Sequence, residues 1–131
     1  MSSSIAAKSK VDEEICAEAS KFVNIYNDCA DLRRNRIGLL YTDNDASLIW
    51  NGNPVKGVSD INAFWNNLPS TQHEISCLDA HPMETNNKSI VAQILGNVSL
   101  GGISRAYSQV LILVYEDGNY KIKSDCYRFI E

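Results

Sequence analysis

Residues 104–116 read SRAYSQVLILVYE, and the run VLILVY inside this stretch is apolar at every position. In an extended strand, successive side chains point to opposite faces of the sheet. The two alternating sets are Leu111, Leu113 and Tyr115 on one side, and Val110, Ile112 and Val114 on the other. An antiparallel sheet covered by helices on one face usually shows polar residues on the other face. This stretch therefore predicts a strand with apolar surface on both faces.

Three neighbouring segments share the period of two that is typical of strands. They are HEISCLDAHP at 73–82, KSIVAQILGNVSL at 88–100 and NYKIKSDCYRFIE at 119–131. The short sequences between the four runs, ETNNK, GG and EDG, are typical of hairpin turns. We therefore expect a long antiparallel meander from about residue 72 to the end of the chain.

The first half of the chain has helical periodicity instead. Apolar residues recur at helical spacing from Val11 onward and predict a long amphipathic helix. The segment 31–41 predicts a second, shorter helix whose arginines face solvent. A third helix is expected over 60–68, with Ser59 as its cap and Pro69 after its end.

A tight hairpin is expected between the second and third helices, in SLIWNGNPVKG at 47–57. The pair Asn51-Gly52 lies between apolar, β-prone residues, and a type I′ turn needs positive φ at both central positions. Trp50 is expected to pack inside the protein. The segment is thus interpreted as a turn rather than as a binding site.

These elements predict an α+β domain, with three N-terminal helices packed on a curved, mostly antiparallel sheet. We expect residues 1–10 to form a flexible N-terminus and residues 11–131 to form a single domain. The apolar second face of the sheet requires either an internal cavity or another protein chain. A partner chain is favoured, because the apolar stripe runs along several strands.

Several classes of function are disfavoured by composition. The net charge is −4, and the basic cluster at Arg33, Arg34 and Arg36 has no interleaved aromatic residues, so direct specific nucleic-acid binding is not expected. The four cysteines form no metal-ligand or redox motif, and we expect neither cofactor nor metal. No leader or membrane span is expected either, which favours a reducing nuclear or cytosolic compartment.

Five segments, in this order and at these spacings, resemble the nuclear transport factor 2-related export proteins, which are the small subunits of the messenger RNA export receptor. The segments are FVNIYNDCADLRRNRIGLLY (22–41), WNGNPVKG (50–57), INAFWNNLPS (61–70), EISCLDAHP (74–82) and KSDCYRF (123–129). The resemblance covers about residues 12–131. It implies a cone-like nuclear transport factor 2-like fold whose sheet face pairs with a homologous domain in the large subunit of the nuclear RNA export factor.

The same resemblance implies a non-catalytic subunit that shuttles between nucleus and cytoplasm and meets nucleoporins only through the large subunit. It also implies that Asp79 forms an ion pair with an arginine of the partner. By strand alternation, Asp79 is expected to share a face with Ile75 and Cys77. Apolar members of the last two strands are expected to supply the rest of the interface: Leu111, Leu113, Tyr127 and Phe129.

Two alternative functions remain open. The first is a small isomerase or dehydratase on the same fold, for which the candidate acid and base residues are Asp45, Asp125, Tyr26, Tyr107, His73 and His81. These six form no spacing that marks a catalytic pair.

The second alternative is a homodimeric import factor for the GDP form of the GTPase Ran. In that relative an acid follows the hairpin tryptophan, and further acids lie in the loop matching SLGGISR. In this chain Asn51 replaces the acid that follows the tryptophan, and the SLGGISR loop contains no acid. The chain therefore lacks the carboxylates whose charge-assisted contacts such recognition needs.

Overall fold

The computed structural model describes residues 2–43, 45–83 and 89–130, with side chains described from residue 12 onward. The helices are α1 (Ser2–Leu32), the 3₁₀ helix η1 (Arg34–Leu40) and α2 (Val58–Asn67). The strands are β1 (Ser47–Trp50), β2 (Asn53–Lys56), β3 (Thr71–Pro82), β4 (Ser89–Leu100), β5 (Ile103–Glu116) and β6 (Asn119–Ile130). The expected turn ETNNK, at 84–88, lies outside the described residues.

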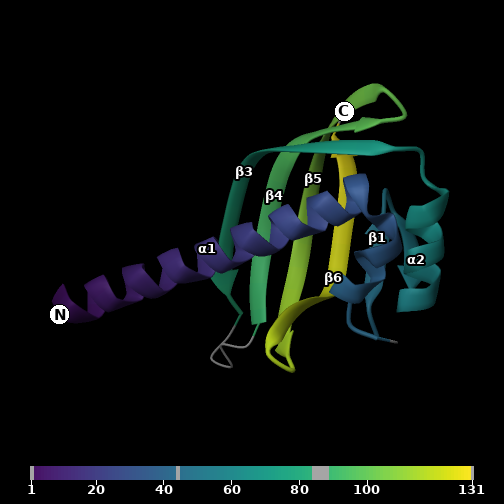
Figure 1. Cartoon of the computed structure of the whole chain (residues 1–131). Coiled ribbons are helices and arrows are strands. Elements are labelled where there is room, and N and C mark those ends of the chain that lie inside the picture. The colour runs from purple at the N-terminus through teal and green to yellow at the C-terminus, as the bar shows by residue number, and fades with distance from the viewer. Residues whose placement is uncertain (1, 44, 84–88, 131) are drawn as a thin grey trace.

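One six-stranded sheet has the order β2-β1-β6-β5-β4-β3. Strands β3 to β6 form the predicted antiparallel meander, and the long strands bend strongly toward one end (Figure 1). Strand β1 pairs in parallel with β6, so the early hairpin extends the sheet beside the last strand. The prediction of an α+β fold with a curved, mostly antiparallel sheet is confirmed.

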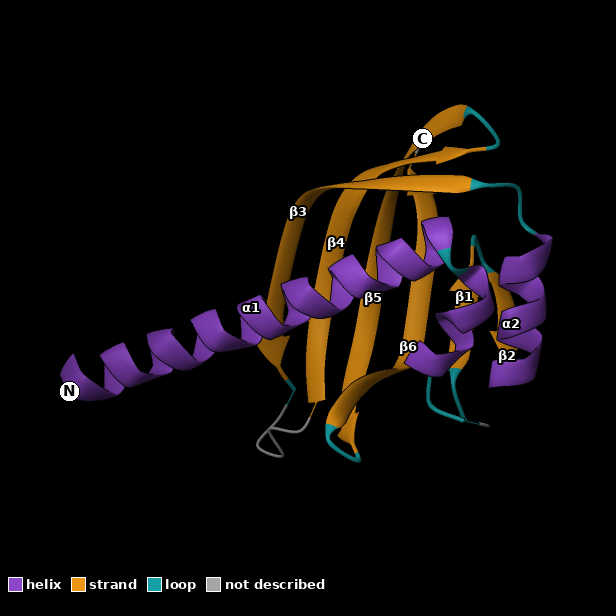
Figure 2. Cartoon of the chain, viewed as in Figure 1, coloured by secondary structure: helices purple, strands orange, loops and turns teal. Residues whose placement is uncertain are grey.

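The helices all lie on one face of this sheet, which we call the inner face (Figure 2). Helix α1 crosses over β3 and β4, while η1 and α2 pack together near β1. Large side chains fill the space between helices and sheet and are fully buried, among them Trp65, Tyr26, Tyr107 and Tyr127. The opposite side of the sheet, the outer face, is covered by no described helix.

The turn between β1 and β2 has the predicted conformation, with φ of 48° at Asn51 and 88° at Gly52. Asn51 also ties the turn to the last strand. Its side-chain Oδ1 accepts the Phe129 N–H at 2.8 Å, and its own N–H donates to the Tyr127 carbonyl at 2.9 Å. The predicted packing of Trp50 is confirmed, because its ring stacks on Tyr127 with centroids 4.4 Å apart.

The helix boundaries differ from those expected. Helix α1 begins at Ser2 rather than near Val11, because residues 2–10 contain neither Pro nor Gly and tolerate a helix. The second helix is 3₁₀ rather than α. Helix α2 begins one position before Ser59, with Gly57 as its N-cap and no side-chain cap. No helix in the described chain is both long and apolar enough to cross a membrane.

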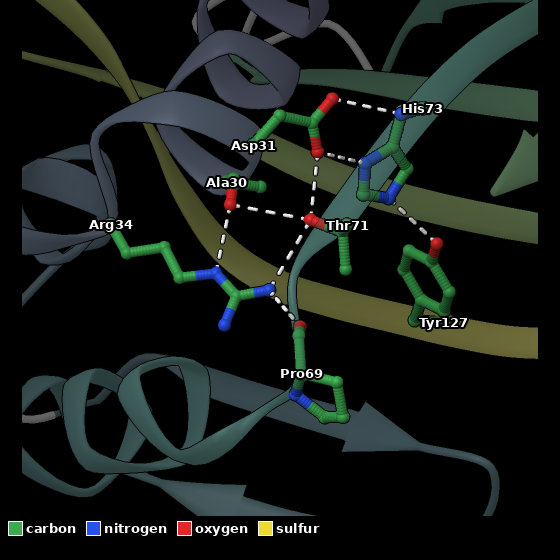
Figure 3. Close-up of polar contacts among 7 residues, drawn as sticks. All are labelled: Ala30, Asp31, Arg34, Pro69, Thr71, His73 and Tyr127. Carbon is green, nitrogen blue, oxygen red and sulfur yellow. Dashed lines mark hydrogen bonds and ion pairs between the residues drawn. The ribbon is translucent and has the colours of Figure 1, made fainter. Parts of the chain in front are cut away.

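The prediction that the arginines of residues 31–41 all face solvent is wrong for Arg34. Its guanidinium donates to the carbonyls of Ala30, Trp65, Leu68 and Pro69 at 2.5–2.9 Å. These carbonyls lie at or just beyond the C-terminal ends of α1 and α2, where helix carbonyls lack partners within the helix. Arg34 therefore caps two helices at once; Figure 3 shows its contacts with the carbonyls of Ala30 and Pro69.

Candidate protein–protein interface

The strand registers place residues of five strands in rows across the outer face. In one row, Cα partners follow each other from β1 to β3: Ile49, Cys126, Val110, Gln93 and Asp79. In the flanking rows, Ile112 pairs with Val91, and Leu95 pairs with Cys77. The sheet therefore presents an apolar centre whose β3 edge carries Asp79.

The apolar side chains of this face are partly in water. Leu95 is 47% exposed, Ile49 37% and Val110 36%. Val91, Ile112 and Cys126 are half-buried. Soluble monomers seldom expose a contiguous apolar area of this kind. The expectation of apolar residues on both faces of the strands is confirmed by this arrangement.

Asp79 and Cys77 both lie exposed on the outer face, but Ile75 does not share it. Between Ile75 and Cys77 the pairing with β4 advances two residues on β3 against one on β4, which is a β-bulge. The bulge reverses the alternation, so Ile75 packs against the core. The expectation that Ile75 shares a face with Cys77 and Asp79 is therefore wrong.

The expected contributions of β5 and β6 are also corrected. Leu111, Leu113 and Tyr127 have no exposed surface, because they point inward under the helices. Phe129 points the same way and packs against Trp50, with ring centroids 5.5 Å apart. The outward residues are the alternate set, in particular Val110, Ile112 and Cys126. Because both sets are equally apolar, the sequence pattern did not distinguish them.

A buried polar network lies on the inner face around Asp125. Tyr26 and Tyr41 donate their hydroxyl protons to Asp125 Oδ2 at 2.9 and 2.7 Å. Gln109 donates Nε2–H to Oδ1 at 2.9 Å. Burial raises the pKa of the Asp125 carboxyl above its usual value, and the three hydrogen bonds offset part of this rise.

A second polar cluster connects α1 with β3 and β6 (Figure 3). The His73 ring, whose side chain is fully buried, lies between Asp31 Oδ1 and the Tyr127 hydroxyl, with both contacts at 2.7 Å. Burial opposes ionisation of Asp31, but hydrogen bonds from His73 and Thr71 outweigh it and lower the pKa of Asp31. This cluster fixes the end of α1 to the sheet.

The six candidate catalytic residues do not form one accessible site. Tyr26 and Asp125 meet, but both are completely buried. Tyr107 and His73 lie in the interior, whereas Asp45 and His81 are exposed elsewhere. The described residues contain no cluster of three or more His, Cys, Asp or Glu suited to a metal ion. The two networks provide hydrogen-bond partners for the buried groups of Asp125 and His73, whereas among the described residues the buried Tyr107 hydroxyl and Gln109 Oε1 have no hydrogen-bond partner.

Sequence reasoning missed Arg34, Tyr41 and Gln109 as members of buried networks, and Leu95 and Val91 as members of the outer face. For Gln109 a signal existed, because it is a polar residue at the start of an apolar run. For Leu95 and Val91 no signal existed in the sequence, because both alternating sets of β4 contain apolar residues; their outward facing follows from the inward position of Gly96, where an added Cβ would come within 2.3 Å of the Glu74 carbonyl oxygen.

Comparisons with known proteins agree with this architecture. Residues 18–129 match the model of the nuclear transport factor 2 (NTF2) domain. The chain is 43% identical to an NTF2-related export protein of Caenorhabditis elegans, over 93% of each chain. It is 36% identical to human NTF2-related export protein 2, over 98% of this chain and 96% of the relative.

Two solved structures are similar in fold. Nuclear transport factor 2 of Cryptosporidium parvum superposes with a TM-score of 0.78 at 25% identity, over 91% of this chain and 94% of that one. A chain of the Candida albicans Mtr2–Mex67 M domain complex superposes with a TM-score of 0.75 at 16% identity, over 88% and 96%. The expected nuclear transport factor 2-like fold is thereby confirmed.

Proposed function

The chain belongs to the nuclear transport factor 2 (NTF2) domain family, and on this premise we propose that it is the non-catalytic small subunit of a heterodimeric messenger RNA export receptor. Its partner is the large subunit of the nuclear RNA export factor, bound through the outer sheet face. The complex carries messenger RNA through nuclear pores, meets nucleoporins through the large subunit, and shuttles between nucleus and cytoplasm.

The observation that carries this proposal is the uncovered apolar centre of the outer face. Ile49, Val110 and Leu95 come from three different strands and share one surface. A stable protein–protein interface buries about 800 Å² on each partner and has an apolar core with a polar rim. The long strands β3 to β6 provide a surface of suitable shape, with Asp79 and His81 at its rim.

Asp79 supplies specificity in this proposal. Its carboxylate is exposed and makes no ion pair or hydrogen bond with any described residue. Burying it against a partner is tolerable only if a cation and hydrogen bonds receive the charge. An arginine suits this role, because its planar fork engages both carboxylate oxygens. Cys77 lies exposed on the same face and edge, where it pairs with Leu95 of the apolar centre.

The relatives support an export role over the alternatives. Both curated relatives described above are named NTF2-related export proteins, and the similar fold of a chain in the Mtr2–Mex67 M domain complex supports assembly with a second protein chain. Against enzyme function, Tyr26 and Asp125 have no exposed surface. No specific binding of RNA by the isolated chain is expected.

The structure also gives a reason to disfavour Ran recognition. Asn51, which replaces the acid of the import factor, is engaged by the backbone of Phe129. Within the acid-free segment SLGGISR, the guanidinium of Arg105, which lies in β5, is 5.2 Å from the centroid of the Phe129 ring. A cation thus occupies the region where the import factor presents carboxylates to a GTPase.

The test is co-expression of the full chain with the NTF2-like domain of the large subunit, followed by purification and titration calorimetry. We expect a one-to-one complex for the parent chain. Asp79→Arg abolishes it, and changing the partner's arginine to an acid restores part of the binding. Asp60→Arg is the matched control, because Asp60 is an exposed acid on α2, away from the outer face. Equal binding by the parent and Asp79→Arg would refute the assigned interface.

A further inference from the structure

Gln93 places a polar side chain beside the apolar centre of the outer face. Its neighbours along β4, Ala92 and Ile94, are buried on the inner face, so Gln93 points to the outer face, where it is exposed. Across the strands, its Cα partners are Val110 on β5 and Asp79 on β3. Gln93 therefore lies between the apolar centre and the carboxylate at the β3 edge.

The amide of Gln93 has unused hydrogen-bonding capacity. Neither this amide nor the Asp79 carboxylate forms a hydrogen bond or an ion pair with any described residue. A glutamine amide offers a carbonyl oxygen that accepts hydrogen bonds and an NH₂ group that donates two. Covering such a group without giving it hydrogen bonds is unfavourable. A partner that covers this row must therefore place polar atoms opposite Gln93.

Asp79 and Gln93 are close enough to contact the same group. Residues directly opposite each other on antiparallel strands have Cβ atoms about 4.5–5.5 Å apart. A partner group that reaches the Asp79 carboxylate thus also reaches the Gln93 amide. A second carboxylate at position 93 would be destabilising, because like charges directly opposite each other repel. Glutamine supplies an acceptor oxygen at this place without that repulsion.

A guanidinium has the hydrogen-bond donors that fit both side chains. Its planar fork gives two N–H groups to a carboxylate such as Asp79 and leaves three further donors, which need acceptors once the pair is covered. The nearest neutral acceptor across the strands is Gln93 Oε1. We infer that Gln93 is a second contact for the partner's arginine: Asp79 accepts two of its N–H groups, and Gln93 Oε1 accepts a third. This inference rests on the proposed function.

The test is a double-mutant cycle between position 93 and the partner's arginine, measured by calorimetry on the full chain and the NTF2-like domain of the large subunit. Gln93→Met keeps the length of the side chain and removes its hydrogen bonds. We expect it to weaken binding by about tenfold, as for the loss of a hydrogen bond to a charged group. With the partner's arginine changed to methionine, we expect Gln93→Met to alter affinity by less than about twofold, because the contacted group is gone.

A second variant tests the same geometry with the opposite sign. Gln93→Lys places an ammonium opposite Asp79, where the two charges pair across the strands. We expect it to bind the parent partner at least about tenfold more weakly, because two cations then meet at one carboxylate. We expect it to bind the arginine-to-methionine partner more tightly than the parent chain does, because Asp79 is paired within its own chain. Weaker binding of that partner would contradict the inference.

Asn97→Leu is the matched control for the loss of an exposed amide. Asn97 is also exposed on β4, but its Cα partners are Glu74 and Ala106 rather than Asp79. We expect its effect on affinity to be the same with either form of the partner.

The role of Gln93 would be overturned if Gln93→Met had equal effects with both forms of the partner, or changed affinity for the parent partner by less than about twofold. The proposed function would still stand in that case, provided that the parent chain binds and Asp79→Arg does not. A parent chain that fails to bind would overturn both.

Discussion

Asp79 and Ile75 lie on opposite faces of β3, although they are four positions apart in the strand. The bulge between Ile75 and Cys77 turns Ile75 toward the core and leaves Asp79 exposed on the outer face. An unbroken strand would place both side chains on one face. The two residues are therefore expected to have different functions, and mutation can separate them.

The first prediction concerns this pair. Ile75→Ala removes a side chain that packs on the core and lowers the free energy of unfolding by about 1–3 kcal/mol, with partner affinity unchanged. Asp79→Arg leaves the free energy of unfolding within about 0.5 kcal/mol. It abolishes partner binding, because it breaks a buried charge pair, which alone costs about two to four orders of magnitude in affinity, and also places two cations together. Urea unfolding and calorimetry measure the two effects; a binding defect in folded Ile75→Ala would contradict the assignment.

The second prediction compares neighbours on β5. Leu111 is fully buried and Val110 is 36% exposed on the outer face. Leu111→Ala lowers the free energy of unfolding by about 2–5 kcal/mol, as a cavity forms in the core. Val110→Asp changes stability little but places an unpaired carboxylate in the interface and abolishes the complex. The reverse pattern, with binding sensitive to Leu111 and stability to Val110, would require the opposite facing of β5.

The third prediction concerns the pH dependence of stability through Asp125. Burial raises the pKa of its carboxyl, so the folded chain keeps this proton at pH values where the unfolded chain has released it. The contribution of Asp125 to stability is therefore complete below its ordinary pKa of about 4 and is lost as pH rises through the raised value.

Asp125→Asn cannot ionise and lacks this dependence. Urea unfolding of parent and variant between pH 4 and pH 8 gives the difference between their free energies of unfolding at each pH. We expect the parent's stability relative to the variant to fall as pH rises. A difference that stays constant across this range would show that the Asp125 pKa is unshifted by folding.

The fourth prediction concerns the double cap formed by Arg34. Arg34→Ala leaves carbonyls at the ends of α1 and α2 without their donor, and we expect a loss of about 1–3 kcal/mol in the free energy of unfolding. Arg34→Lys restores only part of it, because an ammonium cannot reproduce the planar fork. Arg36→Ala is the control: Arg36 is exposed on the same 3₁₀ helix and its removal costs under about 0.5 kcal/mol. Equal losses at the two positions would rule out the cap.

Much of the architecture was predictable from the sequence, because the strands and turns follow from local patterns of apolar and turn-forming residues. The period-two runs gave the four long strands, and the Asn51-Gly52 pair gave the hairpin with both φ angles positive. The sequence could not predict which side chains of β5 point into the core. Val110 and Leu111 belong to two alternating sets that are equally apolar, and only the position of the helices determines that the set of Leu111 is buried. The bulge on β3 leaves no mark in the alternation around Ile75, so the shared face expected for Ile75 and Asp79 was wrong.

The capping role of Arg34 was also beyond the sequence pattern. Its neighbours Arg33 and Arg36 are exposed, and nothing in the local composition separates the three. The distinction arises because the end of α2, about 30 residues later in the chain, comes back to within hydrogen-bond distance. Asp79 was identified as an interface candidate from the resemblance of the sequence to a known family. The structure adds that Asp79 is exposed and that it lies in a row of residues across the outer face.

The parallel pairing of β1 with β6 has a consequence for biosynthesis. Trp50 leaves the ribosome long before its strand neighbour Tyr127, and the β1–β2 hairpin cannot join the rest of the sheet until β6 has been translated. Pairings between distant segments form slowly and expose apolar surface while they are awaited. The tryptophan hairpin is thus left without its β6 neighbour while residues 57–118 between them are synthesised, and its apolar side chains lack their native cover during that interval.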